Sequence, residues 1–224
     1  MGTHPELIMR PEPILLAAYP RSGSTWLRFI VCNAIWADEE FDFDLVNKRF
    51  PGLDGDEGIA DADMPILFLK THEKRHAGNV VFLHRHIGDV LTSEWWYKRK
   101  FHDDTRSLEK YVFDTNFGQE WRELTDFYFP ARINIAFDML NDVETLRDIL
   151  PHSDLDHIVN AMMKSSFDRM QKAEEKGFGI YPAGTKEIKF IRNGTSNQWH
   201  DWPADLQAQL IDKNKKQLKL LGYE

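Results

Sequence analysis

A short loop of small polar residues carries the groups best suited to binding an anion. It reads Tyr19-Pro-Arg-Ser-Gly-Ser-Thr-Trp26 and lies between an apolar run and a segment with helical spacing. Gly23 permits close backbone approach by a ligand, and Arg21 adds a fixed positive charge. Three hydroxyl donors complete it: Ser22, Ser24 and Thr25. Because free N–H groups and the positive dipole end gather where a helix begins, the loop predicts an anion site. The alternative is a turn whose polar residues only cap the helix.

This loop occupies the place of a Walker A phosphate-binding loop but lacks a defining residue. With Gly23 as the second glycine of G-x-x-x-x-G-K-[ST], Ala18 stands at the first glycine and Ser24 at the lysine. The lysine of that motif reaches the β- and γ-phosphates of a nucleotide. Its absence argues against a magnesium–triphosphate ligand.

A histidine suited to proton transfer follows a second apolar run. The segment Leu67-Phe-Leu-Lys-Thr-His72 places Lys70 and His72 at the end of that run. The unperturbed pKa of histidine is near neutrality, which suits a general base. A lone histidine after a strand is more often an ordinary loop residue, so only its position beside the anion sites favours the catalytic interpretation.

A third apolar run is followed by an arginine and then by a helical pattern. Arg85 can bind a phosphate bidentately, and Ser93 adds a neutral donor from the helix. Asp89 would repel a phosphate, so we expect it to cap the helix or to orient other groups. His84 and His86 flank the arginine, but they have no third ligand nearby, and we expect no metal site.

The elements that must position these groups alternate between strands and helices. Three apolar runs are typical of buried strands: Ile14–Ala18, Pro65–Lys70 and Asn79–His84. Helical spacing is expected, among other places, over Trp26–Trp36 (capped by Ser24 or Thr25), Ile87–Lys100, much of Leu108–Asp138, Val143–Leu150, Asp154–Met170 and Pro203–Leu221, with Gly222 as the last stop. Ile188–Ile191 could add a last short strand. The pattern predicts an α/β fold: a single three-layer domain with a central parallel sheet flanked by helices and a P-loop-like strand–loop–helix. Ligands of such sheets bind at the carboxyl ends of the strands, where the three motifs fall.

Together these motifs resemble those of the sulfotransferase family, whose donor is 3′-phosphoadenosine 5′-phosphosulfate (PAPS). Cytosolic members usually read Y-P-K-S-G-T-T-W in the first loop, with Arg21 here in place of their lysine. The resemblance implies that the loop from Arg21 to Trp26 binds the 5′-phosphosulfate and flanks the adenine, and that Arg85 and Ser93 bind the 3′-phosphate. It also implies that His72 is the general base and that Lys70 and Arg21 stabilise charge at the transferring group.

Two C-terminal segments continue the resemblance. Ser165-Ser-Phe-Asp-Arg-Met170 is similar to the family's T-S-F-x-x-M stretch, which implies that Phe167 and Met170 contact the adenine opposite Trp26. Without the resemblance, these residues would be read as a core stripe. Arg192-Asn-Gly-Thr-Ser-Asn-Gln-Trp199 is similar to R-K-G-x-x-G-D-W, a loop that closes over the 3′-phosphate. Its donor-binding residues would be Arg192, Asn193 and Gly194.

Composition and charge limit the number of domains and the kinds of partner that the chain could have. The 224 residues are 42% hydrophobic and 29% charged, as expected for one globular domain over residues 1–224 with an N-terminal extension at 1–13. Residues 37–64 contain ten acidic and two basic side chains, which accounts for the whole net charge of −8. This segment is either a solvated loop or a flap that repels polyanions or attracts a cationic substrate. We expect no nucleic-acid or membrane partner and a cytoplasmic location.

The predicted reaction is sulfonyl transfer to a hydroxyl or amine of a small-molecule acceptor, without a metal. Eight aromatic residues could line the acceptor pocket or belong to the core: Trp95, Trp96, Tyr97, Phe101, Trp121, Phe127, Tyr128 and Phe129. Residues 37–64 should also shape this pocket. Two alternatives stay open, namely a P-loop-like nucleotide kinase and a non-catalytic nucleotide-binding module. Oligomeric state cannot be read from the sequence.

Overall fold

The computed structural model describes residues 13–54, 68–150, 153–175, 190–192 and 194–223. Its centre is a parallel sheet of strand order β2-β1-β3-β4. The strands are β1 (Ile14–Ala18), β2 (Phe68–Thr71), β3 (Val80–His84) and β4 (Ile133–Ala136). The α-helices of the described chain are α1 (Ser24–Ile35), α2 (Phe43–Arg49), α3 (Ile87–Phe101), α4 (Leu108–Asp114), α5 (Gln119–Tyr128), α6 (Val143–Ile149), α7 (Leu155–Lys164), α8 (Phe167–Glu175) and α9 (Ala204–Leu220). Two short 3-10 helices, η1 (Phe137–Asn141) and η2 (Gln198–Asp201), complete the set.

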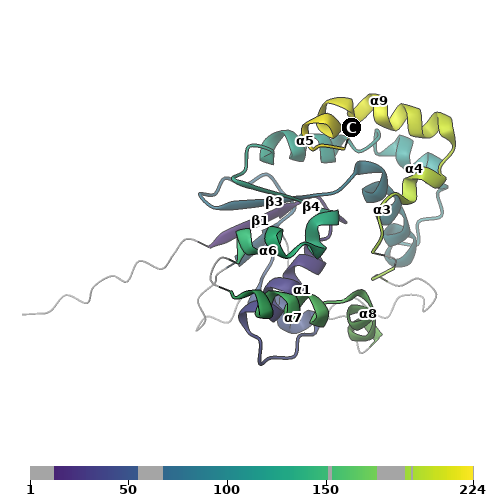
Figure 1. Ribbon diagram of the computed structural model, residues 1–224. Helices are drawn as coiled ribbons and strands as arrows, with labels where there is room; N and C mark the ends of the chain where they lie inside the picture. Colours follow the sequence, from purple (N-terminus) through teal and green to yellow (C-terminus); the bar gives the residue numbers. More distant parts are fainter. Residues whose placement is uncertain (1–12, 55–67, 151–152, 176–189, 193, 224) are drawn as a thin grey trace, which may run out of the picture.

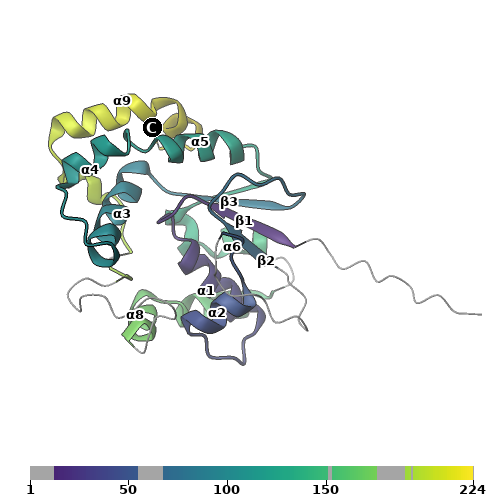
Figure 2. The same ribbon diagram turned by 180° about the vertical axis from the view of Figure 1, so that it is seen from behind.

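Helices cover both faces of the sheet, so the predicted three-layer α/β fold is confirmed (Figure 1). Leu16 packs into a core with α1, α2, α6 and α7, while its neighbour Ala17 packs into a second core with α3, α4, α5 and α9. Phe82 and Leu83 of β3 divide between the two cores in the same way. Because successive residues of a strand point to opposite faces, a strand buried on both sides is apolar throughout. Seen from behind, α1 and α2 lie below the sheet and α9 above it (Figure 2).

The first strand–loop–helix unit forms as expected except at its cap. Neither Ser24 nor Thr25 is the N-cap of α1; that position belongs to Gly23, with φ 101° and no side-chain cap hydrogen bond. A Cβ atom at Gly23 would lie 2.6 Å from Cδ2 of Phe137, so glycine is needed for space as well as for its positive φ. Without a side-chain cap, the first N–H groups of α1 are left to face a ligand.

Helices α4 and α5 confirm the helical spacing expected over much of Leu108–Asp138, but the last part of that stretch is a strand. Residues 133–136 form β4, which the sequence analysis did not predict. The β-branched residues Ile133 and Ile135 alternate along this strand, which pairs with β3 from Val81↔Ile133 to His84↔Ala136. Residues 133–136 therefore extend the sheet.

Asp154–Met170, expected as one helix, is two helices that break at Ser165. The Ser165 carbonyl accepts a hydrogen bond from Trp26 Nε1 (3.0 Å), and its hydroxyl accepts one from Asn33 Nδ2 (3.0 Å). Contacts to α1 thus replace continuation of the helix. Of the expected strand Ile188–Ile191, residues 190 and 191 form none, and 188–189 lie outside the described residues.

The described part of the acidic segment contains a helix that the sequence reading missed. Asp42 caps α2 by accepting a hydrogen bond from the Leu45 N–H (2.8 Å), and Lys48 and Arg49 lie in its last turn. An acidic side chain at the start of α2 and basic side chains at its end complement the helix dipole. Residues 55–64 of this segment and 1–12 of the expected N-terminal extension lie outside the described residues.

Candidate active site

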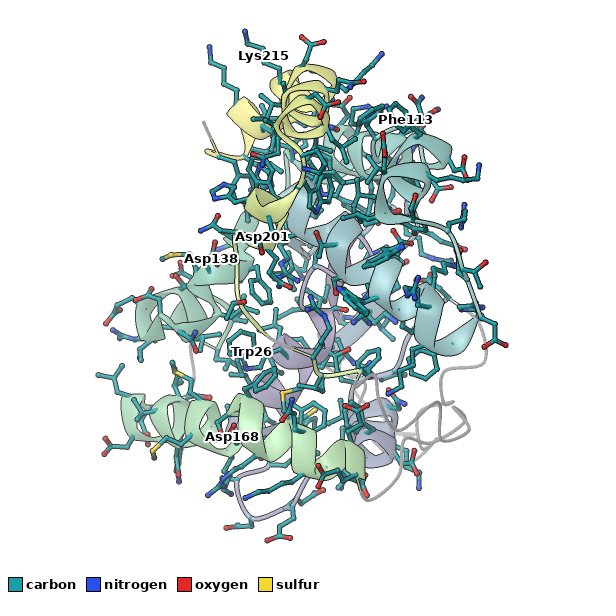
Figure 3. All side chains as sticks on the ribbon, turned by 90° about the vertical axis from the view of Figure 1, so that its right-hand side faces the viewer. Trp26, Phe113, Asp138, Asp168, Asp201 and Lys215 are labelled. Atoms are coloured by element: carbon teal, nitrogen blue, oxygen red, sulfur yellow. The ribbon has the colours of Figure 1, made fainter. Side chains whose placement is uncertain are left out.

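A cavity of about 430 Å³ opens at the carboxyl ends of the parallel strands. Most of the side chains that the sequence singled out line it: Arg21, Gly23, Ser24, Thr25, Trp26, Lys70, His72, Arg85, Ser93, Phe167, Met170, Arg192 and Gly194. In Figure 3, Trp26 lies between η1, which carries Asp138, and α8, which carries Asp168. Segments far apart in the sequence, between residues 20 and 198, therefore meet at one site.

Two of the predicted residues are not seen in this wall. Ser22 is fully buried and does not line the cavity; its hydroxyl has no hydrogen-bond partner within the described structure. The Ser22 N–H donates to the Tyr19 carbonyl (3.2 Å), which closes the turn before Gly23. Asn193 lies outside the described residues.

Arg21 is held from several sides. Its backbone has φ 68°, its Nε donates to Ser93 Oγ (3.2 Å), and its guanidinium lies 5.0 Å from the Tyr97 ring centroid and 4.5 Å from that of Phe190. Burial lowers the pKa of Arg21 to about 10, which leaves the group charged at neutral pH. The loop thus presents an oriented, permanent positive charge.

Lys70 and His72 project from the end of β2, the strand next to β1. The His72 Nδ1 lies 2.6 Å from the Ala18 carbonyl oxygen. A carbonyl oxygen can only accept, so this contact places the hydrogen on Nδ1 and the lone pair on Nε2. Asp54 fixes the turn: it accepts hydrogen bonds from the His72 N–H and from Thr71 Oγ1 (2.7 Å).

Arg85 and the C-terminal loop form a second cationic region. The two terminal nitrogens of Arg85 donate to the carbonyls of Arg21 (3.2 Å) and Thr195 (2.8 Å), and its Nε is buried without a hydrogen-bond partner in the described structure. Its guanidinium lies 4.1 Å from the Phe137 ring centroid. Burial lowers the pKa of Arg85, but Asp89 opposes this. The Nε of this guanidinium can therefore donate a hydrogen bond to an anion.

Asp89 orients that loop, as expected. Its carboxylate accepts hydrogen bonds from the backbone N–H groups of Asn197 (2.8 Å) and Gln198 (2.7 Å). The N-cap of α3, however, is His86, which accepts from the Gly88 N–H (3.1 Å) and stacks on Trp199 (4.5 Å). Within the described residues, no three His, Cys, Asp or Glu side chains are grouped to hold a metal.

The adenine-binding candidates border the same cavity. Trp26 is fixed by its bond to the Ser165 carbonyl and by an edge contact with Phe137 (5.5 Å). Gly194 has φ 64°, and a Cβ there would lie 2.8 Å from Cδ2 of Phe167. Met170 is buried beside them. Close backbone approach at Gly194 and flat aromatic surfaces suit a planar base.

The sequence analysis missed several lining residues, and it left open whether eight aromatic residues belong to a pocket or to the core. Missed were Arg28, Phe43, Val46, Asn47, Glu94, Lys98, His102, Phe137, Phe190 and Gln198. Of the eight aromatic candidates for the acceptor pocket, only Tyr97 is among the described lining residues. Trp121 and Tyr128 belong instead to the core. Three of the missed residues come from α2, so the described part of the segment 37–64 contributes to the cavity wall.

Glu94 is the acidic member of this wall. Burial raises its pKa, while a hydrogen bond from Tyr111 and the charges of Lys98 and Arg21 lower it. Its Oε2 atom is buried without a hydrogen-bond partner in the described structure. Among the described lining residues the charged groups are therefore mainly cationic, and Glu94, beside Arg21, is the one carboxylate.

Comparison with known proteins finds sulfotransferases. A family model described as the sulfotransferase domain matches residues 11–165. Sulfotransferase 2A1 of Macaca fascicularis is 24% identical, covering 93% of this chain and 84% of that protein. Sulfotransferase 1A1 of Bos taurus is 26% identical, covering 90% and 81%.

Solved structures share the fold at low identity. Retinol dehydratase in complex with retinol and PAP superimposes with a TM-score of 0.76 at 16% identity, covering 94% of this chain and 82% of that one. Retinol dehydratase with androsterone and the inactive cofactor PAP gives 0.74 at 17% identity, with the same coverage. No helix in the described part of this chain has the length and apolar character needed to cross a membrane.

Proposed function

The chain belongs to the sulfotransferase domain family, and on that premise we propose that it transfers the sulfonyl group of PAPS to a hydroxyl or amine of a small-molecule acceptor. The observation that carries the proposal is the convergence of Arg21, Lys70, His72 and Arg85 on one cavity at the ends of three adjacent parallel strands. PAP (adenosine 3′,5′-bisphosphate), which is named with both structural neighbours, is the nucleotide product of such a transfer. Retinol and androsterone, the other molecules named there, support a small acceptor.

The donor would lie with its two anionic ends on the two cationic regions. The first N–H groups of α1 and the hydroxyls of Ser24 and Thr25 suit the 5′-phosphosulfate. Arg85, Ser93 and Arg192 suit the 3′-phosphate. The adenine would stack among the aromatic residues near Gly194. Ser22, fully buried and with its N–H bonded to the Tyr19 carbonyl, would support the shape of the loop and not contact the donor through its side chain.

His72 is the proposed general base. Its Nε2 takes the proton of the acceptor hydroxyl, the acceptor oxygen bonds to sulfur, and the bond from sulfur to the 5′-phosphate oxygen breaks. The electron pair of that bond leaves with adenosine 3′,5′-bisphosphate. The hydrogen bond from Nδ1 to the Ala18 carbonyl supports this role, because it orients the ring and stabilises the imidazolium that forms.

Lys70 and Arg21 would stabilise the charge that develops on the sulfonyl oxygens and on the leaving phosphate. Arg21 acts electrostatically: with a pKa of about 10 it keeps its proton at neutral pH. A preorganised cation of this kind needs little rearrangement during the reaction, since two aromatic rings and Ser93 already hold it.

Two rival functions predict different ligands. A P-loop-like kinase would bind magnesium–ATP, but Ser24 stands where its lysine is needed. A non-catalytic nucleotide-binding module would need no base at the reacting centre, whereas His72 lies in the cavity wall with a defined tautomer.

The proposal is tested with PAPS and a panel of phenols, alcohols and amines, with adenosine 3′,5′-bisphosphate as the measured product. His72→Ala should lower turnover at least about 100-fold, the usual contribution of a general base, while nucleotide affinity stays unchanged. His157→Ala, on the exposed side of α7, is the matched control. Near-wild-type turnover in His72→Ala would remove His72 as the base.

A further inference from the structure

A carboxylate on α8 fastens the segment that leads into the C-terminal loop. The two oxygens of Glu174 accept hydrogen bonds from the backbone N–H groups of Phe190 (2.6 Å) and Ile191 (2.9 Å). Gln171, one turn earlier on α8, donates to the Ile191 carbonyl (2.7 Å). The backbone of residues 190–191 is therefore bound to α8 at three points.

The same carboxylate is paired with a lysine from another helix. Lys100 Nζ, at the end of α3, lies 2.8 Å from Glu174 Oε1. Both side chains are about one-tenth exposed (9% and 11%), unlike the surface pair of Lys216 and Asp126 at 73% and 42%. Buried ion pairs carry a large desolvation cost, so breaking one leaves an uncompensated charge. This pair joins α3 and α8, and both helices contribute residues to the cavity wall.

The segment of residues 190–191 that is bound to α8 also contacts Arg21, in the loop that follows β1. The Phe190 ring lies 4.5 Å from the Arg21 guanidinium, which also contacts the Tyr97 ring, and the Phe190 carbonyl accepts a hydrogen bond from Arg21 (3.4 Å). Phe190 also contacts the rings of Phe43 and Tyr97 edge-on, at 6.3 and 6.1 Å. Arg21 thus depends on Phe190 for one of its two aromatic neighbours.

We propose that Glu174 and Lys100 are positioning residues of the donor site: they hold Phe190 against Arg21 and so keep its charge directed at the bound nucleotide. This inference rests on the proposed function, because it assigns Arg21 to the donor. Neither residue touches the cavity in the described structure, so their effect passes through Phe190. A loosened segment would leave Arg21 free to rotate, and ligand binding would then have to order it.

The test measures binding of adenosine 3′,5′-bisphosphate by calorimetry and thermal unfolding of each variant. Glu174→Gln removes one acceptor and the charge; Phe190→Leu keeps an apolar side chain but removes the ring. Each should weaken binding about tenfold, the size of a partly buried cation–π contact. Asp126→Asn, which breaks the exposed pair, is the matched control and should leave the affinity unchanged.

The double variant Glu174→Gln/Phe190→Leu separates a positioning role from general destabilisation. If Glu174 acts through Phe190, the double variant should bind as weakly as the weaker single variant and no weaker. Multiplied losses, or unchanged binding in Glu174→Gln, would overturn the inference. If Glu174→Gln does not fold, unchanged binding in Phe190→Leu overturns it alone. Failure of the wild type to bind the bisphosphate would instead contradict the proposed function.

Discussion

Replacing Arg85 with alanine should remove discrimination for the 3′-phosphate and little else. Arg85 is 6% exposed, and its terminal nitrogens donate to two carbonyls while its Nε has no hydrogen-bond partner in the described structure. A hydrogen bond to a charged group contributes roughly 1.5–3 kcal/mol. Because part of the donor capacity is already used, we expect a net loss of about 2–3 kcal/mol, or about 30- to 150-fold in affinity.

The assay compares two nucleotides that differ only in the 3′-phosphate. Calorimetric titration with adenosine 3′,5′-bisphosphate should show the full loss in Arg85→Ala, whereas 5′-AMP should bind the variant and the wild type about equally. Arg147→Ala, an exposed arginine on α6 paired with Glu144, controls for the loss of one positive charge. Equal losses for both nucleotides, or no loss for the bisphosphate, would refute the assignment of Arg85 to the 3′-phosphate.

Three further predictions follow from contacts around the site. Gly194→Ala should weaken nucleotide binding about tenfold, because φ is 64° and the new Cβ would displace Phe167; unchanged calorimetric affinity would contradict this. Asp54→Asn should lower turnover about tenfold by loosening the turn that holds His72, with the bisphosphate Kd unchanged; a changed Kd with normal turnover would oppose it. His84 is buried and His86 is partly buried, and desolvation lowers the pKa of each to about 4, below the value of about 6.5 in the unfolded chain. The unfolded state therefore binds more protons between these values, and stability should fall by roughly 3 kcal/mol per histidine as pH drops from 7 to 4. In urea unfolding over this pH range, His84→Gln should lose only about half as much stability as the wild type. A loss equal to that of the wild type would contradict the prediction.

The strand–loop–helix units and their order could be predicted from the sequence because local patterns encode them. A five-residue apolar run such as Ile14–Ala18 is typical of a strand buried on both faces, and the polar loop that follows then lies at its carboxyl end. Strand β4 was missed because four residues that include Asn134 give too short an alternation to compete with neighbouring helical spacing. Phe137, which follows β4 and contacts both Trp26 and Arg85, was missed with it.

Contacts between distant segments left no local signal. The bond between Glu174 and the backbone of Phe190 joins residues 16 apart, and the pair with Lys100 spans 74. Asp54 looked like one of ten acids in a charged segment until the structure placed it on the turn before His72. Such roles depend on tertiary packing, and periodicity cannot reveal them.

The central claim is that the cavity is a donor site for a 3′-phosphorylated adenosine nucleotide. Calorimetric titration of the wild-type chain with adenosine 3′,5′-bisphosphate, 5′-AMP and magnesium–ATP tests it most directly. The bisphosphate should bind about 100-fold more tightly than 5′-AMP, given the charge-assisted contacts of Arg85 and Arg192, and its binding should not require magnesium. Equal or tighter binding of magnesium–ATP would contradict the claim and favour a P-loop-like kinase.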